Sequence, residues 1–453
     1  MQVFSNVLEM VGRTPMLEVN KMDTGPCRLF LKLELMNPGG SIKDRIGISM
    51  IEQAEKRGDI KPGDTIVEAT AGNTGLGLAL VAAQKGYRLI LVLPDKMSQE
   101  KIFNLRAMGT EVVLTRSDVA KGHPEYYQDL GRRIAEEHRA YFINQFGNPD
   151  NPLAHETTTA PEIFEQLDGK VDAIVLGVGS SGTVAGFSKY LQKHSPATEL
   201  VIADPVGSVV AGYIATGEIG ESQAWLVEGI GEDFIPSIAD FTGANKAYSI
   251  TDAESFSTAR ELLRKEGILA GSSSGTLLAA ALRYCREQTE PRRVVTLACD
   301  TGNKYLSKLF NDFWLEDQGF IRREPHGDLR DLIGRPHEEH ATITVGPTDI
   351  LTTAHNRLRN AGFSQLPVMD QGRLVGVVTE DTLIKFAYGK PELMTAKVAD
   401  AMESAFIKLE KEASINNLVA MLAVQPYAAV MDGEKFLGLI TRSDVLNYLR
   451  KQM

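Results

Sequence analysis

Between residues 29 and 310, short apolar runs alternate with helix-like stretches, and this alternation limits the possible folds more than any other feature of the chain. The runs at 65–69, 89–93, 173–176, 200–202 and 294–297 are apolar almost throughout, rather than at every second position. Strands of that kind are buried on both faces, as in a parallel sheet. Helical patterns at 99–108, 183–193 and 253–266 lie between them. We therefore predict an α/β fold with open sheets.

One turn in this region carries a lysine in an unusual place. Residues 37–45 follow an apolar run and precede a helix-like stretch, so Lys43 falls in the first helical turn, with Ser41 as a candidate cap. A cation there faces the positive end of the helix dipole, which lowers the amine pKa and favours the neutral, nucleophilic form. An ordinary solvated lysine is the alternative that this turn alone leaves open.

Three turns are polar and rich in glycine. Those at 69–75 and 177–183 follow predicted strands, and the one at 271–275 begins a predicted helix. Open α/β sheets bind ligands at the carboxyl ends of their strands. Turns that converge there, together with the lysine, indicate a single site.

The turn at 177–183 is a candidate phosphate cradle. It lies between a buried strand and a helix start, where backbone amides and hydroxyls favour an anion, and its donors are Gly179, Ser180, Ser181, Gly182 and Thr183. A tight strand–helix connection is the alternative. No Gly-Lys-Ser/Thr closes the turn, so it is not a Walker loop, and the spacing in 72–77 does not match a dinucleotide fingerprint.

A phosphate cradle, an amine nucleophile and a loop rich in Ser, Thr and Asn together indicate pyridoxal phosphate bound as a Schiff base. Asn73 is placed to hold the phenolic oxygen of the cofactor, and residues 70–74 to hold an amino-acid carboxylate. A serine at the ring nitrogen would favour elimination of a β-substituent, whereas a carboxylate there would strengthen the electron sink.

Beyond a polar stretch between Trp314 and His340, the sequence repeats itself. Val368-Met369-Asp370, Gly376 and Thr379 recur as Val430-Met431-Asp432, Gly438 and Thr441. Each half reads helix, strand, turn, strand, helix, and the halves should pack together because neither buries its apolar face alone. We predict a catalytic domain at 1–318, a linker at 319–338 and a repeat module at 339–453.

The motifs at 37–45, 70–75, 179–183 and 271–275 resemble, in order and spacing, the fold-type II pyridoxal-phosphate enzymes of the cysteine synthase and cystathionine β-synthase family. Residues 148–155 and 228–236 are similar to the cystathionine β-synthase branch, and the C-terminal repeat resembles the paired CBS (cystathionine-β-synthase) domains, or Bateman module. The resemblance covers nearly the whole chain. It implies a catalytic core of two open twisted sheets.

The resemblance also implies roles for single residues. Lys43 would bind pyridoxal 5′-phosphate and move the Cα proton, Asn73 would meet the 3′ oxygen, and Ser273 the ring nitrogen. The phosphate would lie on residues 179–183, and the substrate carboxylate on Thr70, Gly72, Thr74 and Gln145. The implied reaction is a β-replacement of transsulfuration, in which homocysteine displaces the β-substituent of serine or O-acetylserine to give cystathionine.

Some positions depart from the family pattern. Ala71 replaces a serine, and Phe146 and Glu232 stand where some relatives have tyrosine. The choice between serine and O-acetylserine, and the use of sulfide or cysteine, therefore stay open. Met1 lies almost at the start of the catalytic domain, which leaves no room for a haem-binding extension, so we expect no haem.

In the repeat module, Thr441 and Asp444 match the Thr-x-x-Asp that grips an adenosyl ribose in relatives, whereas the first repeat has Thr382 in place of the aspartate. The resemblance implies S-adenosylmethionine or another adenosyl ligand. A capped helix start is the alternative.

Composition limits the partners, metal sites and cellular location that we expect for this protein. The formal charge of −11 argues against nucleic-acid and anionic-membrane partners. The 3 cysteines (Cys27, Cys285 and Cys299) are far apart and form no Cys-x-x-Cys, which fits a reducing cytosol without disulfides or a metal site. No signal peptide or apolar span is visible, so we expect a cytoplasmic protein.

The family implies a homodimer or larger assembly acting on small amino acids. Cysteine synthase and a non-catalytic adenosyl-ligand sensor are the rival functions.

Overall fold

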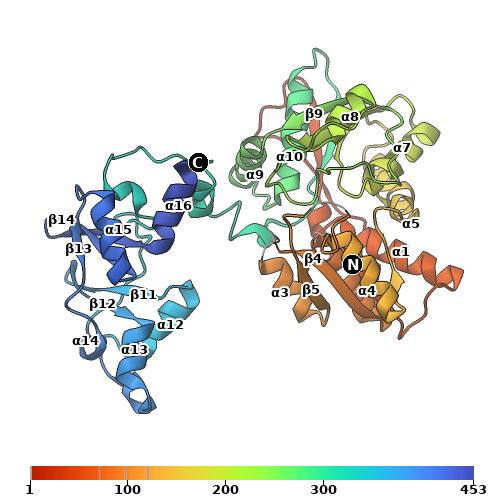
Figure 1. Ribbon diagram of the computed structural model, residues 1–453. Coiled ribbons are helices and arrows are strands. Elements are labelled where there is room, and N and C mark those ends of the chain that lie inside the picture. The colour runs from red at the N-terminus through yellow and green to blue at the C-terminus, as the bar shows by residue number, and fades with distance from the viewer. Residues whose placement is uncertain (1–2, 71, 96, 98, 120–121, 453) are drawn as a thin grey trace. The chain divides into compact units, whose positions relative to one another are not determined.

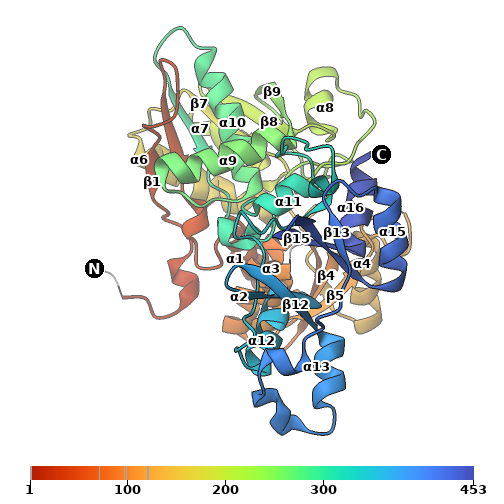
Figure 2. The same cartoon turned by 90° about the vertical axis from the view of Figure 1, so that its left-hand side faces the viewer.

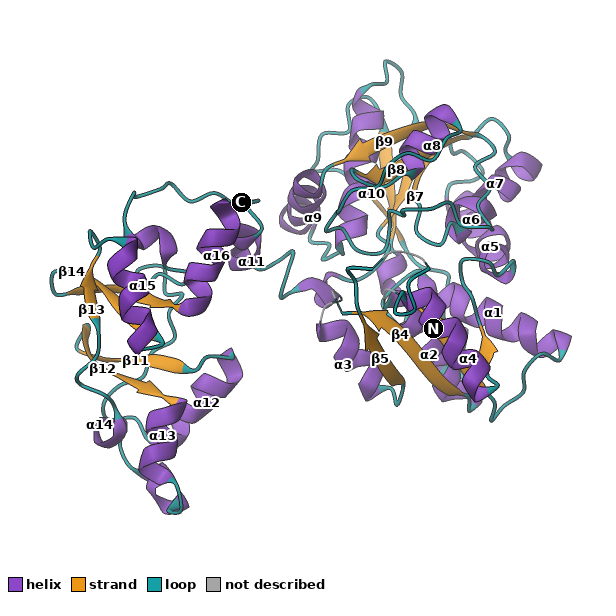
Figure 3. Cartoon of the chain, viewed as in Figure 1, coloured by secondary structure: helices purple, strands orange, loops and turns teal. Residues whose placement is uncertain are grey.

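The computed structural model describes residues 3–70, 72–95, 97, 99–119 and 122–452. The chain divides into two compact units, Met1–Asn311 and Asp312–Met453. The first is an α/β unit and the second contains the repeat, so the predicted fold class is confirmed (Figure 3).

The first unit holds two open sheets. The six-stranded sheet has the order β1-β2-β10-β7-β8-β9, and the four-stranded sheet the order β5-β4-β3-β6. Every strand pair is parallel except β1 with β2. The strands are β1 (Met16–Glu18), β2 (Arg28–Lys32), β3 (Thr65–Ala69), β4 (Arg88–Pro94), β5 (Glu111–Thr115), β6 (Tyr141–Phe142), β7 (Ala173–Gly177), β8 (Glu199–Pro205), β9 (Ala244–Ile250) and β10 (Arg293–Leu297).

Helices connect these strands, as parallel pairing requires. They are α1 (Lys43–Arg57), α2 (Asn73–Lys85), α3 (Gln99–Ala107), α4 (Tyr127–His138), α5 (Asp150–Ala154), α6 (Ala160–Gln166), α7 (Gly182–His194), α8 (Val210–Thr216), α9 (Asp252–Glu266) and α10 (Ser272–Arg286). Shorter turns are η1 (Val7–Met10), η2 (Glu34–Met36), η3 (His155–Thr159) and η4 (Gly302–Tyr305). Helices α9 and α10 lie side by side in both views (Figure 1; Figure 2).

The apolar strands are buried on both faces, as their composition predicts. In the four-stranded sheet, Ile66 and Leu91 pack with residues of α1, α2 and α3. Their neighbours Val67 and Ile90 point the other way, to Ala135 of α4. Both faces of the sheet are therefore covered by helices.

The predicted loops gather at the carboxyl ends of these strands. Residues 70–72 follow β3 and residues 178–181 follow β7. The loop before α10 follows no strand, but Ala270 forms a bridge with Thr301, just beyond the end of β10. The edge rule accounts for the loops after β7 and β10, which belong to one sheet, and the loop after β3, in the other sheet, is joined to them by the hydrogen bond from Asn73 Nδ2 to Asp300 Oδ2.

The second unit contains the two sequence repeats. Its elements are α11 (Asp312–Asp317), η5 (Leu329–Leu332), α12 (Leu351–Ala361), β11 (Gln365–Asp370), β12 (Arg373–Thr379), α13 (Glu380–Ala387), η6 (Pro391–Thr395), α14 (Val398–Ala401), β13 (Lys408–Glu410), α15 (Ile415–Val424), β14 (Tyr427–Asp432), β15 (Lys435–Thr441) and α16 (Arg442–Gln452). Val368 pairs with Gly376 in the first hairpin, and Val430 with Gly438 in the second. Both hairpins have a β-bulge after that valine, so the two repeats share their strand register as well as their sequence.

Each hairpin is covered by the segment that leads into the other repeat. A Cβ on Gly376 would lie 2.6 Å from Sδ of Met402, on the way from the first repeat to the second. A Cβ on Gly438 would lie 2.5 Å from Cγ2 of Ile333, which precedes the first repeat. The two repeats are therefore interleaved.

The stretch predicted as a linker contributes to this unit. Leu329, Leu332 and Ile333 are buried in the cluster that contains Leu418 and Ile440. The apolar residues are too few and too widely spaced to predict an element from sequence. The domain limits at 318 and 338 stay predictions.

Candidate active site

The lysine turn begins α1 directly. Ile42 is the residue before the helix, and the Lys43 N–H donates to Ser41 Oγ at 3.2 Å. Burial lowers the pKa of Lys43 below its ordinary value, while nearby Asp300 and Glu232 oppose the shift. The amine is therefore closer to its neutral form than a surface lysine would be.

A buried ion network holds this turn from behind. The guanidinium of Arg45 donates to both carboxylate oxygens of Glu34, at 2.7 and 2.8 Å, and to Glu162 at 2.7 Å. Lys32, which is fully buried, donates to the same Glu162 at 2.8 Å. Bidentate pairing fixes the direction of Arg45, and with it the start of α1.

Asp300 joins the loops of the site. Its carbonyl oxygen accepts from the Gly271 N–H at 3.0 Å, and the residue forms a bridge with Ser41. Its Oδ2 accepts from Asn73 Nδ2 at 2.7 Å and from the Tyr305 hydroxyl at 2.6 Å. One buried aspartate thus connects the lysine turn, the Asn73 loop and the start of α10.

Lys304 completes the contacts of Asn73. Its Nζ donates to Asn73 Oδ1 at 3.0 Å and to the carbonyl oxygens of Gly39 and Gly40 at 3.0 and 3.3 Å. Burial lowers its pKa to about 8. The carbonyl of the Asn73 amide therefore faces a cation, and its NH₂ group faces a carboxylate.

A second set of charges extends this network. Lys101 Nζ donates to Glu228 Oε2 at 2.6 Å and to the Tyr305 hydroxyl at 3.2 Å, and Lys308 donates to Glu228 Oε1 at 2.7 Å. A Cβ on Gly72, whose φ is +115°, would lie 2.8 Å from Cδ of Lys101. The turn at Gly72 therefore needs glycine both for its conformation and for this close approach.

The predicted carboxylate-binding residues lie together. The Thr74 hydroxyl donates to Gln145 Oε1 at 2.7 Å, and the Gly72 N–H donates to Thr70 Oγ1 at 3.1 Å. All are buried. Ala71 lies outside the described residues, so the substrate choice that depends on it stays a prediction.

The predicted phosphate loop has the features of an anion site. Ser181 adopts a left-handed conformation with φ +69°, and its buried Oγ has no hydrogen-bond partner. A Cβ on Gly179 would lie 2.6 Å from the carbonyl oxygen of Gly229, so the loop packs closely on that segment. Gly182 and Thr183 open α7, and the backbone amides of a helix start favour an anion.

Ser273 lies near the lysine turn. It is buried at the second position of α10. Burial raises the pKa of the Cys299 thiol to about 12, and the Ser273 hydroxyl opposes this shift. Because the Ile42 N–H donates to the Cys299 carbonyl oxygen at 2.9 Å, the three residues occupy one region.

Aromatic rings and a carboxylate lie beside the site. The ring centroids of Tyr127 and Phe146 are 6.5 Å apart, and those of Phe146 and Phe234 are 5.6 Å apart. Burial and the charge of Glu232 raise the pKa of Tyr127 well above its ordinary value. The charge of Glu232 also opposes the lowering of the Lys43 pKa, so this carboxylate acts electrostatically on both Tyr127 and Lys43.

Sequence reasoning gave no role to several charged residues of the site and one tyrosine. They are Lys101, Glu228, Asp300, Lys304, Tyr305 and Lys308. The edge rule for parallel strands could have indicated Asp300, which lies just beyond the carboxyl end of β10.

Comparisons with known proteins agree with this geometry. Residues 7–300 match the family described as pyridoxal-phosphate dependent enzyme, and residues 338–389 and 398–451 match the CBS domain. The chain is 36% identical over 466 residues to the cystathionine beta-synthase of Dictyostelium discoideum, covering 99% of this chain and 93% of that protein. The chain belongs to the cystathionine β-synthase family. It is 34% identical to the Saccharomyces cerevisiae family member, over 98% of this chain and 97% of that one.

The chain is also similar to solved structures. The O-acetylserine dependent cystathionine beta-synthase of Helicobacter pylori matches with a TM-score of 0.63 and 38% identity, over 68% of this chain and 99% of that one. A hydrogen sulfide-producing enzyme of Fusobacterium nucleatum gives the same TM-score of 0.63 and 38% identity, over 67% of this chain and all of that one.

As a family member, the chain is an enzyme that uses pyridoxal phosphate. The residues present fit this cofactor, because an orphaned Ser181 hydroxyl and a helix start suit its phosphate, and the Lys43 amine, whose pKa is lowered by burial, suits its aldehyde. Within the described part of the chain, no group of 3 or more His, Cys, Asp or Glu side chains is placed to hold a metal ion. No helix formed by the described residues is long and apolar enough to cross a membrane.

Proposed function

We propose that the first unit condenses L-serine or O-acetyl-L-serine with L-homocysteine to give L-cystathionine, by β-replacement. One observation carries the proposal: a desolvated Lys43 lies with Asn73 and Ser273 around Asp300, at the edge that also bears the phosphate loop. The relatives named cystathionine beta-synthase support the reaction type.

Each predicted residue has a task in this proposal. When bound, pyridoxal phosphate supplies the electron sink that acidifies a Cα–H bond and allows a β-substituent to leave. Lys43 would bind the aldehyde, and once the amine of the substrate has replaced it there, the freed Nζ would take the Cα proton, because its lowered pKa leaves a larger neutral fraction. Asn73 donates to the phenolic oxygen, Ser273 meets the ring nitrogen, and residues 179–183 hold the phosphate.

The substrate loop binds the amino acid through its carboxylate. Thr70, Gly72, Thr74 and Gln145 are buried polar residues of one cluster, and the Thr74 hydroxyl and the Gly72 N–H, which donate within the cluster, would turn to the carboxylate when the substrate binds. A carboxylate held there keeps the Cα–H bond within reach of Lys43, so binding and proton transfer depend on the same loop.

Glu232 supports an amino-acid thiol as the second substrate. Its carboxylate, which shifts the pKa values of both Lys43 and Tyr127, would attract the ammonium group of homocysteine and repel the hydrosulfide anion. This observation favours cystathionine formation over the cysteine synthase reaction.

The test compares serine and O-acetylserine, each with homocysteine and with sulfide. We expect turnover with homocysteine, and a yellow protein whose Schiff-base absorbance disappears in Lys43→Ala. Glu232→Gln, which keeps the size of the side chain, should raise KM for homocysteine and lower KM for sulfide. Fast turnover with sulfide beside negligible turnover with homocysteine would refute the proposal.

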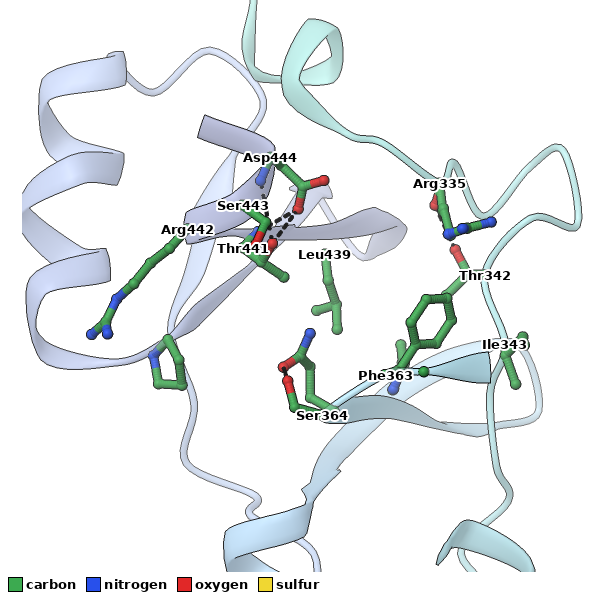
Figure 4. Close-up of a pocket in the computed structure, with 14 residues that line it drawn as sticks. Arg335, Thr342, Ile343, Phe363, Ser364, Leu439, Thr441, Arg442, Ser443 and Asp444 are labelled. Atoms are coloured by element: carbon green, nitrogen blue, oxygen red, sulfur yellow. Dashed lines mark hydrogen bonds between the residues drawn. The ribbon is translucent and has the colours of Figure 1, made fainter. Parts of the chain in front are cut away.

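A cavity of about 410 Å³ in the second unit supports a regulatory site (Figure 4). Thr441, Asp444, Arg335 and Phe363 line it. The Thr441 hydroxyl and N–H both donate to Asp444 Oδ2, at 2.6 and 2.7 Å, which is the geometry of a helix cap. The other side carries the Phe363 ring, 5.1 Å from the Arg335 guanidinium, a surface suited to a flat base.

We therefore propose that this cavity binds an adenosyl compound such as S-adenosylmethionine. The ligand should raise the unfolding temperature of the second unit, and Asp444→Asn should weaken that rise. A shift that is equal in wild type and variant would place the ligand elsewhere. We also propose a homodimer or larger assembly, which light scattering of the full chain tests.

A further inference from the structure

The segment between β6 and α6 carries two buried polar side chains that no step above uses. Asn151 lies in α5, and His155 begins the π-helical turn η3 one helical turn later. Both are almost fully buried, with 1% and 0% exposed. Single π-turns often occur at functional sites, so their surroundings matter.

Both side chains lie directly behind the phosphate loop. A Cβ on Gly182 would come within 1.8 Å of Asn151 Oδ1, and a Cβ on Gly186 within 2.7 Å of His155 Cβ. Asn151 Nδ2 lies 2.9 Å from Ser180 Oγ, and His155 Nε2 lies 3.3 Å from Thr183 Oγ1. Each therefore contacts one hydroxyl of the loop.

The direction of the Asn151 amide is fixed by its second contact. Nδ2 also donates to the Gln145 carbonyl oxygen at 2.8 Å, and a carbonyl oxygen can only accept. If the amide were flipped, Asn151 Oδ1 would face the Gln145 carbonyl oxygen, and neither atom could donate a hydrogen bond. Asn151 therefore donates to Ser180 Oγ, and the hydroxyl proton of Ser180 remains available for another acceptor.

The tautomer of His155 decides whether the ring donates to the Thr183 hydroxyl or accepts from it. Its Nδ1 lies 2.9 Å from Thr159 Oγ1. Burial, with the charges of Lys43 and Arg45, lowers the pKa of His155 well below its ordinary value, so the ring is neutral and has one N–H. If Nε2 carries that proton, Thr183 Oγ1 accepts it and turns its own hydroxyl proton outward.

We propose that Asn151 and His155 are positioning residues that donate to Ser180 and Thr183 from behind, and so direct both hydroxyl protons toward a bound phosphate. In the opposite tautomer, Thr183 would donate to the ring and present a lone pair to the anion. The inference rests on the proposal that residues 179–183 hold the cofactor phosphate.

The experiment compares the affinities for pyridoxal phosphate and pyridoxal, which lacks the phosphate. Wild type should prefer pyridoxal phosphate. His155→Leu should weaken pyridoxal phosphate roughly 10- to 100-fold, the range for losing a hydrogen bond to a charged group, and leave pyridoxal unchanged. His155→Gln retains a donor at the Nε2 position and should restore most of the preference. Thr157→Val is the matched control, since its exposed hydroxyl donates to the Leu153 carbonyl oxygen at 2.7 Å.

Thr183→Val separates this inference from the proposed function. If wild type has no preference, or Thr183→Val retains it, the loop does not hold the phosphate and the proposed site fails. If Thr183→Val loses the preference but His155→Leu retains it, only the positioning role is overturned.

Nitrogen-15 NMR of the wild-type holoenzyme reads the tautomer of His155 directly, and a variant is needed only to assign the signal. The His155 signal, identified by its loss in His155→Gln, should show a neutral ring protonated at Nε2. A ring protonated at Nδ1, or at both nitrogens, would overturn the inference.

Discussion

The buried pair Lys101–Glu228 allows a sharp test of how charge supports this site. The two side chains are 1% and 8% exposed, and Nζ lies 2.6 Å from Oε2. Glu228 has a second partner in Lys308, which is 24% exposed. Lys101 also donates to the Tyr305 hydroxyl, at 3.2 Å, which carries no charge to balance its own. The two residues should therefore differ in what their removal leaves behind.

Glu228→Gln leaves the charge of Lys101 buried without a carboxylate, so the free energy of unfolding should fall by about 3–5 kcal/mol. Lys101→Met leaves Glu228 paired with Lys308, so the loss should be about 1–3 kcal/mol. In the double variant no buried charge remains at this pair. Its cost should be smaller than the sum of the single costs by about 2 kcal/mol.

The assay follows urea unfolding of the cofactor-free chain by tryptophan fluorescence. Trp225 lies in the first unit and Trp314 in the second. A Trp314→Phe background therefore leaves a signal from the first unit alone. Equal costs for the two single variants, or costs that add in the double variant, would refute the reasoning that an uncompensated Lys101 dominates.

Other expected outcomes concern single residues. Burial raises the pKa of Glu68 to about 8 from 4.5, so the native state holds a proton that the unfolded chain releases. Stability should therefore fall as pH rises from about 5 to 8, by at most about 1.4 kcal/mol per pH unit, and urea unfolding of Glu68→Gln should lack this slope. Gly182→Ala places a methyl group against Asn151, so we expect a loss of about 1–3 kcal/mol and weaker cofactor binding by fluorescence titration. Thr441→Val removes the cap shared with Asp444, and calorimetry should show about 1 kcal/mol lost from the second unit alone.

The sequence predicted the parts of this protein that follow local rules. Strands buried on both faces read as continuous apolar runs, so β3, β4, β7, β8 and β10 were found close to their true limits. The lysine turn was recognised because Pro, Gly and a misplaced cation are visible side by side. The repeat was recognised because its residues recur at equal spacing, and the shared bulge confirms it.

The burial of charged residues could not be predicted from local sequence rules. Lys101 and Lys304 occur in stretches that look like any solvated helix face or turn, and only tertiary contacts reveal that both are buried. The same limit applies to Leu329 and Leu332, whose neighbours are charged although both pack in a core. Burial of isolated residues depends on segments distant in sequence, which periodicity does not register.

The interleaving of the second unit bears on how the chain can be divided. Ile333 covers the hairpin of the second repeat, and Met402 covers that of the first. A fragment that begins at residue 339 would contain both matched CBS repeats, yet it would expose the apolar surface around Gly438. Neither repeat is a separable piece, and any insertion, swap or truncation that respects the repeat borders would cut through shared structure. A fragment of the second unit should therefore begin upstream of Leu329, the first residue of this segment that packs in the core of the second repeat.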